Sequence, residues 1–436
     1  MRNIKKLGAI ATTLTMSLSL LSGCSSTKEQ TTTGFQPELD TETTASLSVI
    51  GDYSNFEALE AIIDDFNEYY PNVTITYTKC DFYNVENLQT MLDSSEKPDI
   101  CMTSYWMRDT TLMDSFEDMS FLDLSNIQDG LITKSNDEVK MVPIFTNTYG
   151  MIVNEQIFEE NNLTVPTTYS ELIDVCAKLK EAGYESPIMG YTGTGSAEYL
   201  NSISYPMLNK AISENPEAID ELNPTKISYD EEGSTIYEYK ENADASILDS
   251  TLEKVQDFTN QGLIDVDKCS EEISDGYEGA ILRFFEGDVP MLFTNAETLS
   301  GTKKRETLSE AYQNNSFEYN FYLTPLTDDG CYFELSLSRA FSVNAKSENL
   351  DMTNEFMRFL VQKDELNKMA QVKGLPTVTN DYGYDERYAT FNDYDPIYSD
   401  SLNITDGALR QVREAVRAVA SKELTIQQAE EKYGKY

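Results

Sequence analysis

Segments with a strand pattern alternate with segments with a helix pattern at the start of the folded body. The strand-like runs are residues 47–50, 73–77 and 99–102, and the helical runs between them are residues 56–66 and 85–92. In the first helical run the apolar residues recur at steps of three and four, as on one buried helix face. The order strand, helix, strand, helix, strand predicts a doubly wound parallel sheet.

The same alternation continues along the rest of the chain. Further strand-like runs are residues 142–145, 150–153, 186–189 and 289–293, and further helical runs are residues 168–179, 252–258, 280–285 and 409–419. A Ser or Thr followed three residues later by Glu or Gln indicates a capping box at a helix start. These pairs are Ser54 and Glu57, Thr168 and Glu171, and Thr425 and Gln428. Residues 222–249 are acidic and aperiodic, so we expect a surface excursion there.

The length and the pattern together predict an α/β protein of two doubly wound lobes. A chain of 436 residues has room for two domains. In such sheets, ligands bind beyond the carboxyl ends of the strands. Tyr53, Tyr105, Trp106 and Tyr149 follow predicted strands or lie in the turns at their ends. We therefore expect these aromatic residues at a cleft between the lobes.

Charge and composition exclude several classes of function. The chain has 75 acidic and 33 basic residues, a formal net charge of -42, and no histidine. The negative electrostatic field of such a chain repels the phosphate backbones of nucleic acids, so nucleic acid is not an expected partner. The lack of histidine removes Ser-His-Asp and Cys-His catalysis and His-ligated zinc. The acidic clusters also lack the spacing of calcium loops. We expect no cofactor and no metal site.

The first 24 residues have the pattern of a lipoprotein signal. A positively charged start precedes a moderately apolar run, residues 7–20, of the length of a secretory signal peptide. Residues 21–24 read Leu-Ser-Gly-Cys, which resembles the bacterial lipobox, in which the cysteine is acylated after cleavage. We expect Cys24 to carry the lipid and to hold the protein on the extracytoplasmic face of the cell membrane. Five cysteines remain, and whether any two form a disulfide stays open.

Six loose motifs follow the lipobox along nearly the whole mature chain. They are Tyr-Tyr-Pro-Asn-Val at 69–73, Lys-Pro-Asp-Ile at 97–100, Pro-Thr-Thr-Tyr-Ser-Glu-Leu at 166–172, Phe-Glu-Gly-Asp-Val-Pro-Met at 285–291, the pair of segments 339–344 and 356–360, and Gly-Leu-Pro at 374–376. No single motif is specific. In this order they resemble the family 1 extracellular solute-binding proteins of bacterial ABC importers, the sugar-type group that is similar to maltose-binding protein.

The resemblance implies a fold and a function. The fold would be two α/β lobes of the type II periplasmic-binding-protein kind, with chain crossings near residues 146–148 and 333–338 and after residue 376. The protein would be a monomer without enzymatic activity that captures a carbohydrate, commonly an oligosaccharide, for ABC permease subunits. The expected domains are a signal peptide at 1–23, a flexible tether at 24–46, a first lobe at 47–146 with 334–390 returning to it, and a second lobe at 149–332 with 391–436 returning to it.

A carbohydrate site needs aromatic rings for the C–H faces of the sugar and polar side chains for its hydroxyls. The candidates are Tyr53, Glu57, Tyr105, Trp106, Asn147, Tyr149, Asn295, Glu297 and Arg339. Trp106, the only tryptophan, is either a stacking platform or a core residue. Arg339 would contact ligand hydroxyls or pair with a carboxylate of a lobe. Residues 293–297 lack the Gly-x-Trp turn of the family, so Asn295 or Glu297 would contact the ligand by hydrogen bonds instead.

Three other functions stay open at this point. A cationic or peptide solute would fit an aromatic box on an acidic protein, and moderate salt would abolish its binding. A ligand-sensing lipoprotein would act on a membrane receptor instead of a permease. A surface glycosidase would need two carboxylates in the cleft, and no glycosidase motif is visible in the sequence.

Overall fold

The computed structural model describes residues 34–80, 85–108, 110–193, 196–229, 235–273 and 276–435. The chain divides into two units, Met1–Gln36 and Pro37–Tyr436. Residues 34–36 are the described part of the first unit, and they form neither helix nor strand. The signal peptide and Cys24 lie outside the described residues. Everything that follows concerns the unit Pro37–Tyr436.

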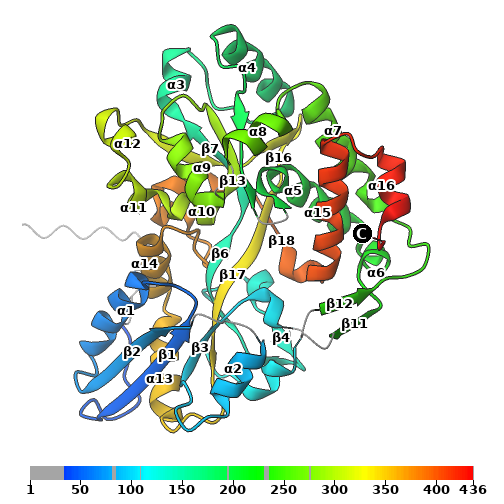
Figure 1. The fold of residues 1–436 in the computed structure, drawn as a ribbon. Coiled ribbons are helices and arrows are strands. Elements are labelled where there is room, and N and C mark those ends of the chain that lie inside the picture. The colour runs from blue at the N-terminus through cyan, green and yellow to red at the C-terminus, as the bar shows by residue number, and fades with distance from the viewer. Residues whose placement is uncertain are drawn as a thin grey trace, which may run out of the picture. The chain divides into compact units, whose positions relative to one another are not determined.

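One sheet of six strands forms the centre of what we call the first lobe (Figure 1). Its strands are β1 (Ala45–Gly51), β2 (Val73–Lys79), β3 (Ile100–Thr103), β6 (Val142–Asn147), β17 (Phe333–Val343) and β18 (Pro396–Tyr398). The order is β18-β17-β3-β1-β2, and β6 also pairs with β17. β1 runs parallel to β2 and β3, whereas β17 is antiparallel to β3 and β6. The parallel part is the doubly wound sheet that the sequence predicts.

A second sheet of four strands forms the centre of the second lobe. Its strands are β7 (Tyr149–Asn154), β8 (Ile188–Met189), β13 (Met291–Asn295) and β14 (Tyr319–Tyr322), in the order β14-β7-β13-β8. Thr148 is the single residue between β6 of the first sheet and β7 of the second. Its hydroxyl donates to the backbone oxygen of Glu334, at 2.5 Å, and so joins this crossing to β17. The boundaries of the two lobes stay a prediction.

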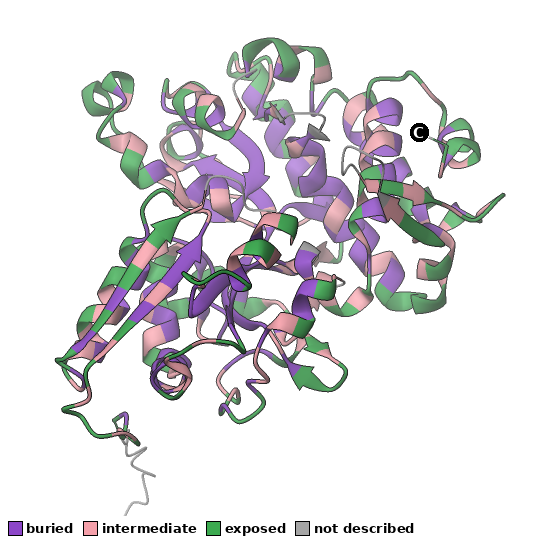
Figure 2. Cartoon of the chain, turned by 60° about the horizontal axis from the view of Figure 1, so that its bottom comes forward, coloured by how far each residue is buried: buried purple, intermediate pink, exposed green. Residues whose placement is uncertain are grey.

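Helices cover the buried faces of both sheets. The first lobe has α1 (Glu57–Asn67), α2 (Val85–Leu92), α13 (Leu350–Leu360) and α14 (Lys363–Lys373). The second lobe has α3 (Glu155–Glu160), α4 (Tyr169–Glu181), α5 (Glu198–Glu214), α7 (Asp249–Asn260), α8 (Val266–Glu272), α9 (Gly276–Phe284), α10 (Ala296–Ser300), α11 (Thr302–Glu306), α12 (Glu310–Asn314), α15 (Asp406–Ala420) and α16 (Ile426–Lys432). Figure 2 shows buried strands beneath helices whose outer faces are exposed. Strands covered on both faces read as continuous apolar runs, and all residues of β3 and β13 are buried.

The predicted α/β fold with two lobes is confirmed, and most predicted elements are present within a few residues. The capping boxes at Thr168 and Thr425 are both formed. The one at Ser54 is wrong, because α1 begins at Glu57 and its N-cap is Phe56, which has no side-chain capping bond. The ring of Phe56 is buried against Tyr53 and Tyr77, so packing sets this helix start.

The segment predicted as a surface excursion contains a small hairpin. Its strands are β11 (Lys226–Tyr229) and β12 (Thr235–Glu238), which pair in antiparallel register. The five cysteines after Cys24 are all free thiols, and Cys176 is buried in α4, as expected for a small core residue. Within the described ranges, no helix combines the length and the apolar character that crossing a bilayer requires.

The chain start of this unit is fixed to the first lobe. The backbone N–H of Glu38 donates to Oε1 of Glu355 on α13, at 2.8 Å. The hydroxyl of Tyr70 donates to the same carboxylate oxygen, at 2.5 Å, and Glu355 is only 2% exposed. Hydrogen bonds to a buried carboxylate are among the stronger ones in proteins. The backbone N–H of Leu39 also donates to the Tyr70 hydroxyl at 3.3 Å, so residues 38 and 39 are held against α13 and Tyr70.

Candidate functional site

Two adjoining cavities have walls from both lobes. The first, which we call the tyrosine cavity, has a volume of about 200 Å³. It is lined by Tyr105, Arg108, Asn147, Tyr149, Tyr205, Asn209, Glu297, Glu334, Ser336, Leu337, Ser338, Arg339, Ser399, Asp400, Ile404, Leu409 and Arg413. The second, the lysine cavity, has a volume of about 500 Å³. It is lined by Tyr53, Glu57, Ala58, Tyr191, Tyr277, Asn295, Glu297, Thr298, Ser300, Gly301, Lys303, Lys304, Arg305, Val372, Lys373 and Leu375. Glu297 belongs to both walls.

Three tyrosine rings from separate elements meet in the tyrosine cavity. Tyr105 begins the 3-10 turn η1 (Tyr105–Met107) one residue after β3, Tyr149 begins β7, and Tyr205 lies on α5. The rings of Tyr149 and Tyr205 pack edge to face, with centroids 4.9 Å apart. The Tyr149 hydroxyl donates to Glu198 at 3.1 Å, and burial raises the pKa of this phenol. The rings therefore offer neutral faces with fixed orientation to a ligand.

Strand β17 presents polar side chains to the cavity at every second residue. Glu334, Ser336 and Ser338 all line it, because alternate residues of a strand point to the same side. The pairing of β17 with β6 shifts register between Leu337 and Ala340, and such a bulge turns a side chain out of the strict alternation. Arg339 therefore lines the same cavity as its neighbour Ser338.

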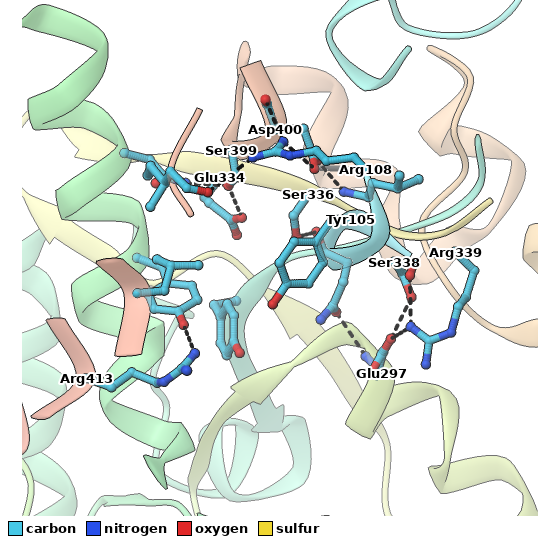
Figure 3. A pocket seen from close by; sticks show the side chains of 17 residues that line it. Tyr105, Arg108, Glu297, Glu334, Ser336, Ser338, Arg339, Ser399, Asp400 and Arg413 are labelled. Atoms are coloured by element: carbon cyan, nitrogen blue, oxygen red, sulfur yellow. Dashed lines mark hydrogen bonds and ion pairs between the residues drawn. The ribbon is translucent and has the colours of Figure 1, made fainter. Parts of the chain in front are cut away.

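Glu334 is a buried acid with one free carboxylate oxygen. It is 1% exposed, and its Oε1 accepts a hydrogen bond from the Ser399 hydroxyl. Its Oε2 has no hydrogen-bond partner among the residues that the structure describes. Burial raises the pKa of this carboxyl to about 7. A buried polar atom without a partner is costly, and a donor from a ligand in the cavity would satisfy it. Figure 3 shows Glu334 with Tyr105, Ser336 and Arg413 around the same space.

Each guanidinium of the tyrosine cavity has a carboxylate partner. Nη1 of Arg108 lies 3.6 Å from Asp400, and Nη2 of Arg413 lies 3.8 Å from Asp406. Arg339 lies 2.9 Å from Asp52 and 3.7 Å from Glu297 (Figure 3 shows the second contact). The positive charges of this wall are therefore largely balanced within the protein. A wall of paired charges and tyrosine rings suits a ligand rich in hydroxyl groups.

The structure divides the nine residues that the sequence proposes between the two cavities. Tyr105, Asn147, Tyr149, Glu297 and Arg339 line the tyrosine cavity. Tyr53, Glu57 and Asn295 line the lysine cavity, together with Glu297. The backbone of Trp106 belongs to η1, but its side chain lies outside the described part of the structure.

Several of these side chains already have partners within the protein. Oδ1 of Asn295 accepts from the backbone N–H of Thr298 at 3.0 Å, as the N-cap of α10. Oδ1 of Asn147 accepts from the backbone N–H of Glu297 at 3.2 Å. Arg339 pairs with carboxylates, which is one of the two roles expected for it. The amide groups of both asparagines keep their Nδ2 atoms for other contacts.

Twelve of the 17 residues that line the tyrosine cavity are not among those that the sequence proposes. The polar residues that it did not propose are Arg108, Tyr205, Asn209, Glu334, Ser336, Ser338, Ser399, Asp400 and Arg413. One of them had a visible signal, because Glu334 is a carboxylate inside the apolar run of residues 333–343. Of the others, Arg108 directly follows η1, and Ser336 and Ser338 lie on β17. The remaining five lie on α5, η8 (Ser399–Leu402) and α15, far from β3 in sequence. Only the fold brings them together.

The part of the chain that the structure describes holds no group of three or more carboxylate or cysteine side chains arranged to bind a metal ion.

Comparison with known proteins identifies the family. Residues 61–390 match the family described as bacterial extracellular solute-binding protein. No curated protein matches the chain. Among solved structures, apo RafE from Streptococcus pneumoniae is 18% identical with a TM-score of 0.62, covering 92% of this chain and 98% of that one. The GacH receptor of Streptomyces glaucescens, solved unliganded and with acarbose, is 14% identical with a TM-score of 0.63, covering 90% and 97%.

A stachyose complex of a sugar transporter from Bacillus licheniformis is 16% identical with a TM-score of 0.59, covering 90% of this chain and 98% of that one. These likenesses show that the fold is the two-lobe α/β fold of such binding proteins. The family match covers most of the chain, including β2, β3, β6 and β17 of the first sheet and the whole second sheet. The chain therefore belongs to the bacterial extracellular solute-binding proteins.

Proposed function

We propose that this protein captures a carbohydrate, most simply an oligosaccharide, outside the cell and delivers it to the permease subunits of an ABC importer. The tyrosine cavity carries this proposal. It combines three tyrosine rings with paired charges and with Glu334, whose Oε2 has no partner among the described residues. Rings cover the C–H faces of a sugar, and Glu334, Asn209 and the β17 hydroxyls can pair with its hydroxyl rim.

The solved structures of similar fold support the class of ligand. They include complexes with raffinose, stachyose, acarbose and maltose. Identity to these proteins is 14–18%, so the specific sugar does not transfer. The cavity walls come from both lobes, so a solute bound there would stabilise an arrangement with the lobes closed over it. The binding step involves no covalent change in the solute.

We also propose a lipid anchor at Cys24, which would hold the protein on the extracytoplasmic face of the cell membrane. The support is the lipobox-like sequence of residues 21–24 and the membership of an extracellular family. One acyl chain gives only weak anchoring, whereas two or more hold a protein stably on a bilayer. The anchored protein acts as a monomer, because one chain supplies both lobes and both cavities.

The test is a thermal-shift screen of the purified chain against raffinose, stachyose, maltose and spermidine. A ligand that binds only the native form raises the melting temperature. We expect a saccharide to raise it, with calorimetry giving one site per chain and no reducing sugar released on long incubation. A rise with spermidine alone would support the cationic solute instead, and release of reducing sugar would show a glycosidase.

A further inference from the structure

The lysine cavity carries a charge opposite to that of the chain as a whole. Acidic residues outnumber basic ones 75 to 33 in the sequence. The wall of this cavity reverses the balance, with four cationic side chains, Lys303, Lys304, Arg305 and Lys373, against the carboxylates of Glu57 and Glu297. Three of the cations lie on α11 of the second lobe and the fourth ends α14 of the first. The positive charge is therefore assembled across the cleft from both lobes.

An ion pair within the described part of the protein accounts for only one of these four cations. Arg305 pairs with Glu278, which lies outside the lining, at 3.0 Å, and Glu297 is held by Arg339 and by the Ser338 hydroxyl. For the remaining three, Lys303, Lys304 and Lys373, no carboxylate of the described residues lies within ion-pair distance. Of the two lining carboxylates, Glu297 pairs with Arg339, and Glu57 has no ion-pair partner among the described residues. The wall keeps an excess of unpaired positive charge.

Lys373 forms no ion pair among the described residues, although the charges of Glu297, Glu57 and Asp52 act on it. Its Nζ lies 3.8 Å from the centre of the Tyr53 ring. Burial lowers the pKa of this ammonium, because removal from water disfavours the charged form. The nearby charges of Glu297 and Glu57 oppose this effect only in part. An anion placed in the cavity would restore the favourable environment that the ammonium loses on burial.

The lysine cavity also fits a sugar unit. Tyr53, Tyr191 and Tyr277 line it, with Lys373 over the Tyr53 ring and Arg305 over the Tyr277 ring. Glu297 belongs to its wall and to the wall of the tyrosine cavity. The two cavities therefore adjoin at Glu297. The volume of about 500 Å³ lies within the range of about 300–1,000 Å³ that small-molecule sites have.

We propose that the lysine cavity binds an anionic group of the captured solute, so that the solute is an acidic oligosaccharide with a carboxylate or a sulfate on one sugar unit. Its neutral units lie in the tyrosine cavity. This inference rests on the proposed carbohydrate function and adds the charge of the substrate to it. Lys373 and the lysines of α11 contact the anion from opposite lobes, so the anion itself favours closure.

The test compares matched ligands by calorimetry on the purified protein. Trigalacturonate and its methyl ester have the same sugar skeleton and differ in charge, and neocarrabiose sulfate provides the sulfate case. We expect at least one of the two acidic probes to bind at least tenfold more tightly than the uncharged ester, since charge-assisted hydrogen bonds are the stronger ones. Raising NaCl from 50 to 500 mM should weaken acidic-probe binding and leave binding of neutral sugars unchanged.

Matched variants assign the effect to this cavity. Lys373→Met and Lys303→Met should each lower affinity for the acidic probe about tenfold or more without changing affinity for neutral sugars. Lys178→Met removes an exposed lysine of α4, which lines neither cavity, and should change nothing. Lys303 is exposed, so its variant reports on binding even if Lys373→Met lowers stability.

The outcomes separate this inference from the proposed function. Binding of raffinose, stachyose or maltose without binding of either acidic probe would overturn the anionic site and leave carbohydrate capture standing. Equal affinity for trigalacturonate and its ester, or acidic-probe binding that the Lys373 and Lys303 variants leave unchanged, would also overturn it. Binding of no saccharide, neutral or acidic, would overturn both proposals.

Discussion

Arg339 in β17 binds both carboxylate oxygens of Asp52, with Nε at 3.3 Å from Oδ1 and Nη2 at 2.9 Å from Oδ2. Asp52 directly follows β1 of the first lobe. The same guanidinium lies 3.7 Å from Glu297 on α10 of the second lobe. One side chain thus links the two lobes electrostatically at the border of the two cavities. Two-point contact of this kind also fixes the orientation of the guanidinium.

Replacement of Arg339 by Met should lower the free energy of unfolding. The change leaves Asp52 and Glu297 without their cationic partner. These carboxylates are 32% and 40% exposed, so water compensates for part of the loss. We expect a decrease of about 1–2 kcal/mol by urea denaturation. Arg410→Met, which removes an exposed arginine of α15, is the control, and equal midpoints for the two variants would contradict the role of Arg339.

Glu334 should make stability depend on pH. Its pKa is raised from 4.5 to about 7 by burial, so the folded protein retains a proton between these pH values that the unfolded chain has released. The contribution of this proton is complete below about pH 4.5 and is lost as the pH rises through about 7. Relative to Glu334→Gln, the wild type should therefore lose on the order of 3 kcal/mol between pH 4.5 and 8.

The measurement for Glu334 is the difference in unfolding free energy between wild type and variant across this pH range. Glu86→Gln changes an exposed carboxyl of α2 and serves as the control, because the difference should there be independent of pH. A flat difference for Glu334→Gln as well would show that the folded carboxyl titrates normally.

Tyr105 should contribute directly to solute binding. Truncation of an aromatic side chain in a buried site typically costs about 1–3 kcal/mol of binding free energy. We expect Tyr105→Ala to weaken binding of the captured saccharide by this amount, and Tyr105→Phe to retain most of the affinity because the ring stays. Tyr384→Ala removes an exposed ring that lines neither cavity. Calorimetry that gives the same affinity for Tyr105→Ala and Tyr384→Ala would remove Tyr105 from the site.

Trp106 follows Tyr105 in η1, one residue before the buried Met107. We predict that Trp106→Ala also weakens binding by about 1–3 kcal/mol. A core role would instead lower the melting temperature of the unliganded protein and leave affinity unchanged. Calorimetry and a melting curve on the same variant decide between these two roles.

Replacement of Cys24 by Ala should release the protein from membranes, since the thiol is the proposed site of acylation. Fractionation of cells that express the variant should give the protein in the soluble extracytoplasmic or culture fraction. Cys331→Ala, at a partly buried free thiol, should leave the membrane fraction unchanged. Membrane-bound Cys24→Ala protein would rule out the lipid anchor.

The fold was predictable largely because its central strands are buried on both faces. Such strands, β3 and β13 among them, form short apolar runs that are visible in the sequence. Helix α5 was missed for a related reason. It is buried on most of its surface and contains Pro206 in its interior, so it shows neither an amphipathic period nor an uninterrupted helical pattern.

The site was predictable only near strand ends. Tyr105 and Tyr149, which line the tyrosine cavity, could be proposed because Tyr105 lies two positions after β3 and Tyr149 begins β7, both strands of recognisable pattern. Arg413 and Tyr205 meet through a hydrogen bond of 3.0 Å across 208 residues of sequence, and no local pattern indicates this pairing. The same is true of the lysine cavity, where α11 and α14 are far apart in sequence.

The bonds from Glu38 and Tyr70 to Glu355 have a mechanical consequence. Any pull applied along the leader before Pro37 enters the body at α13, beside β1, and not through the four-stranded sheet. In a protein anchored through the residues before Pro37, the lobe that contains α13 would therefore be the one held in place. In the anchored protein proposed above, closure of the lobes on a solute would then move the other lobe and carry the lysines of α11 toward Lys373.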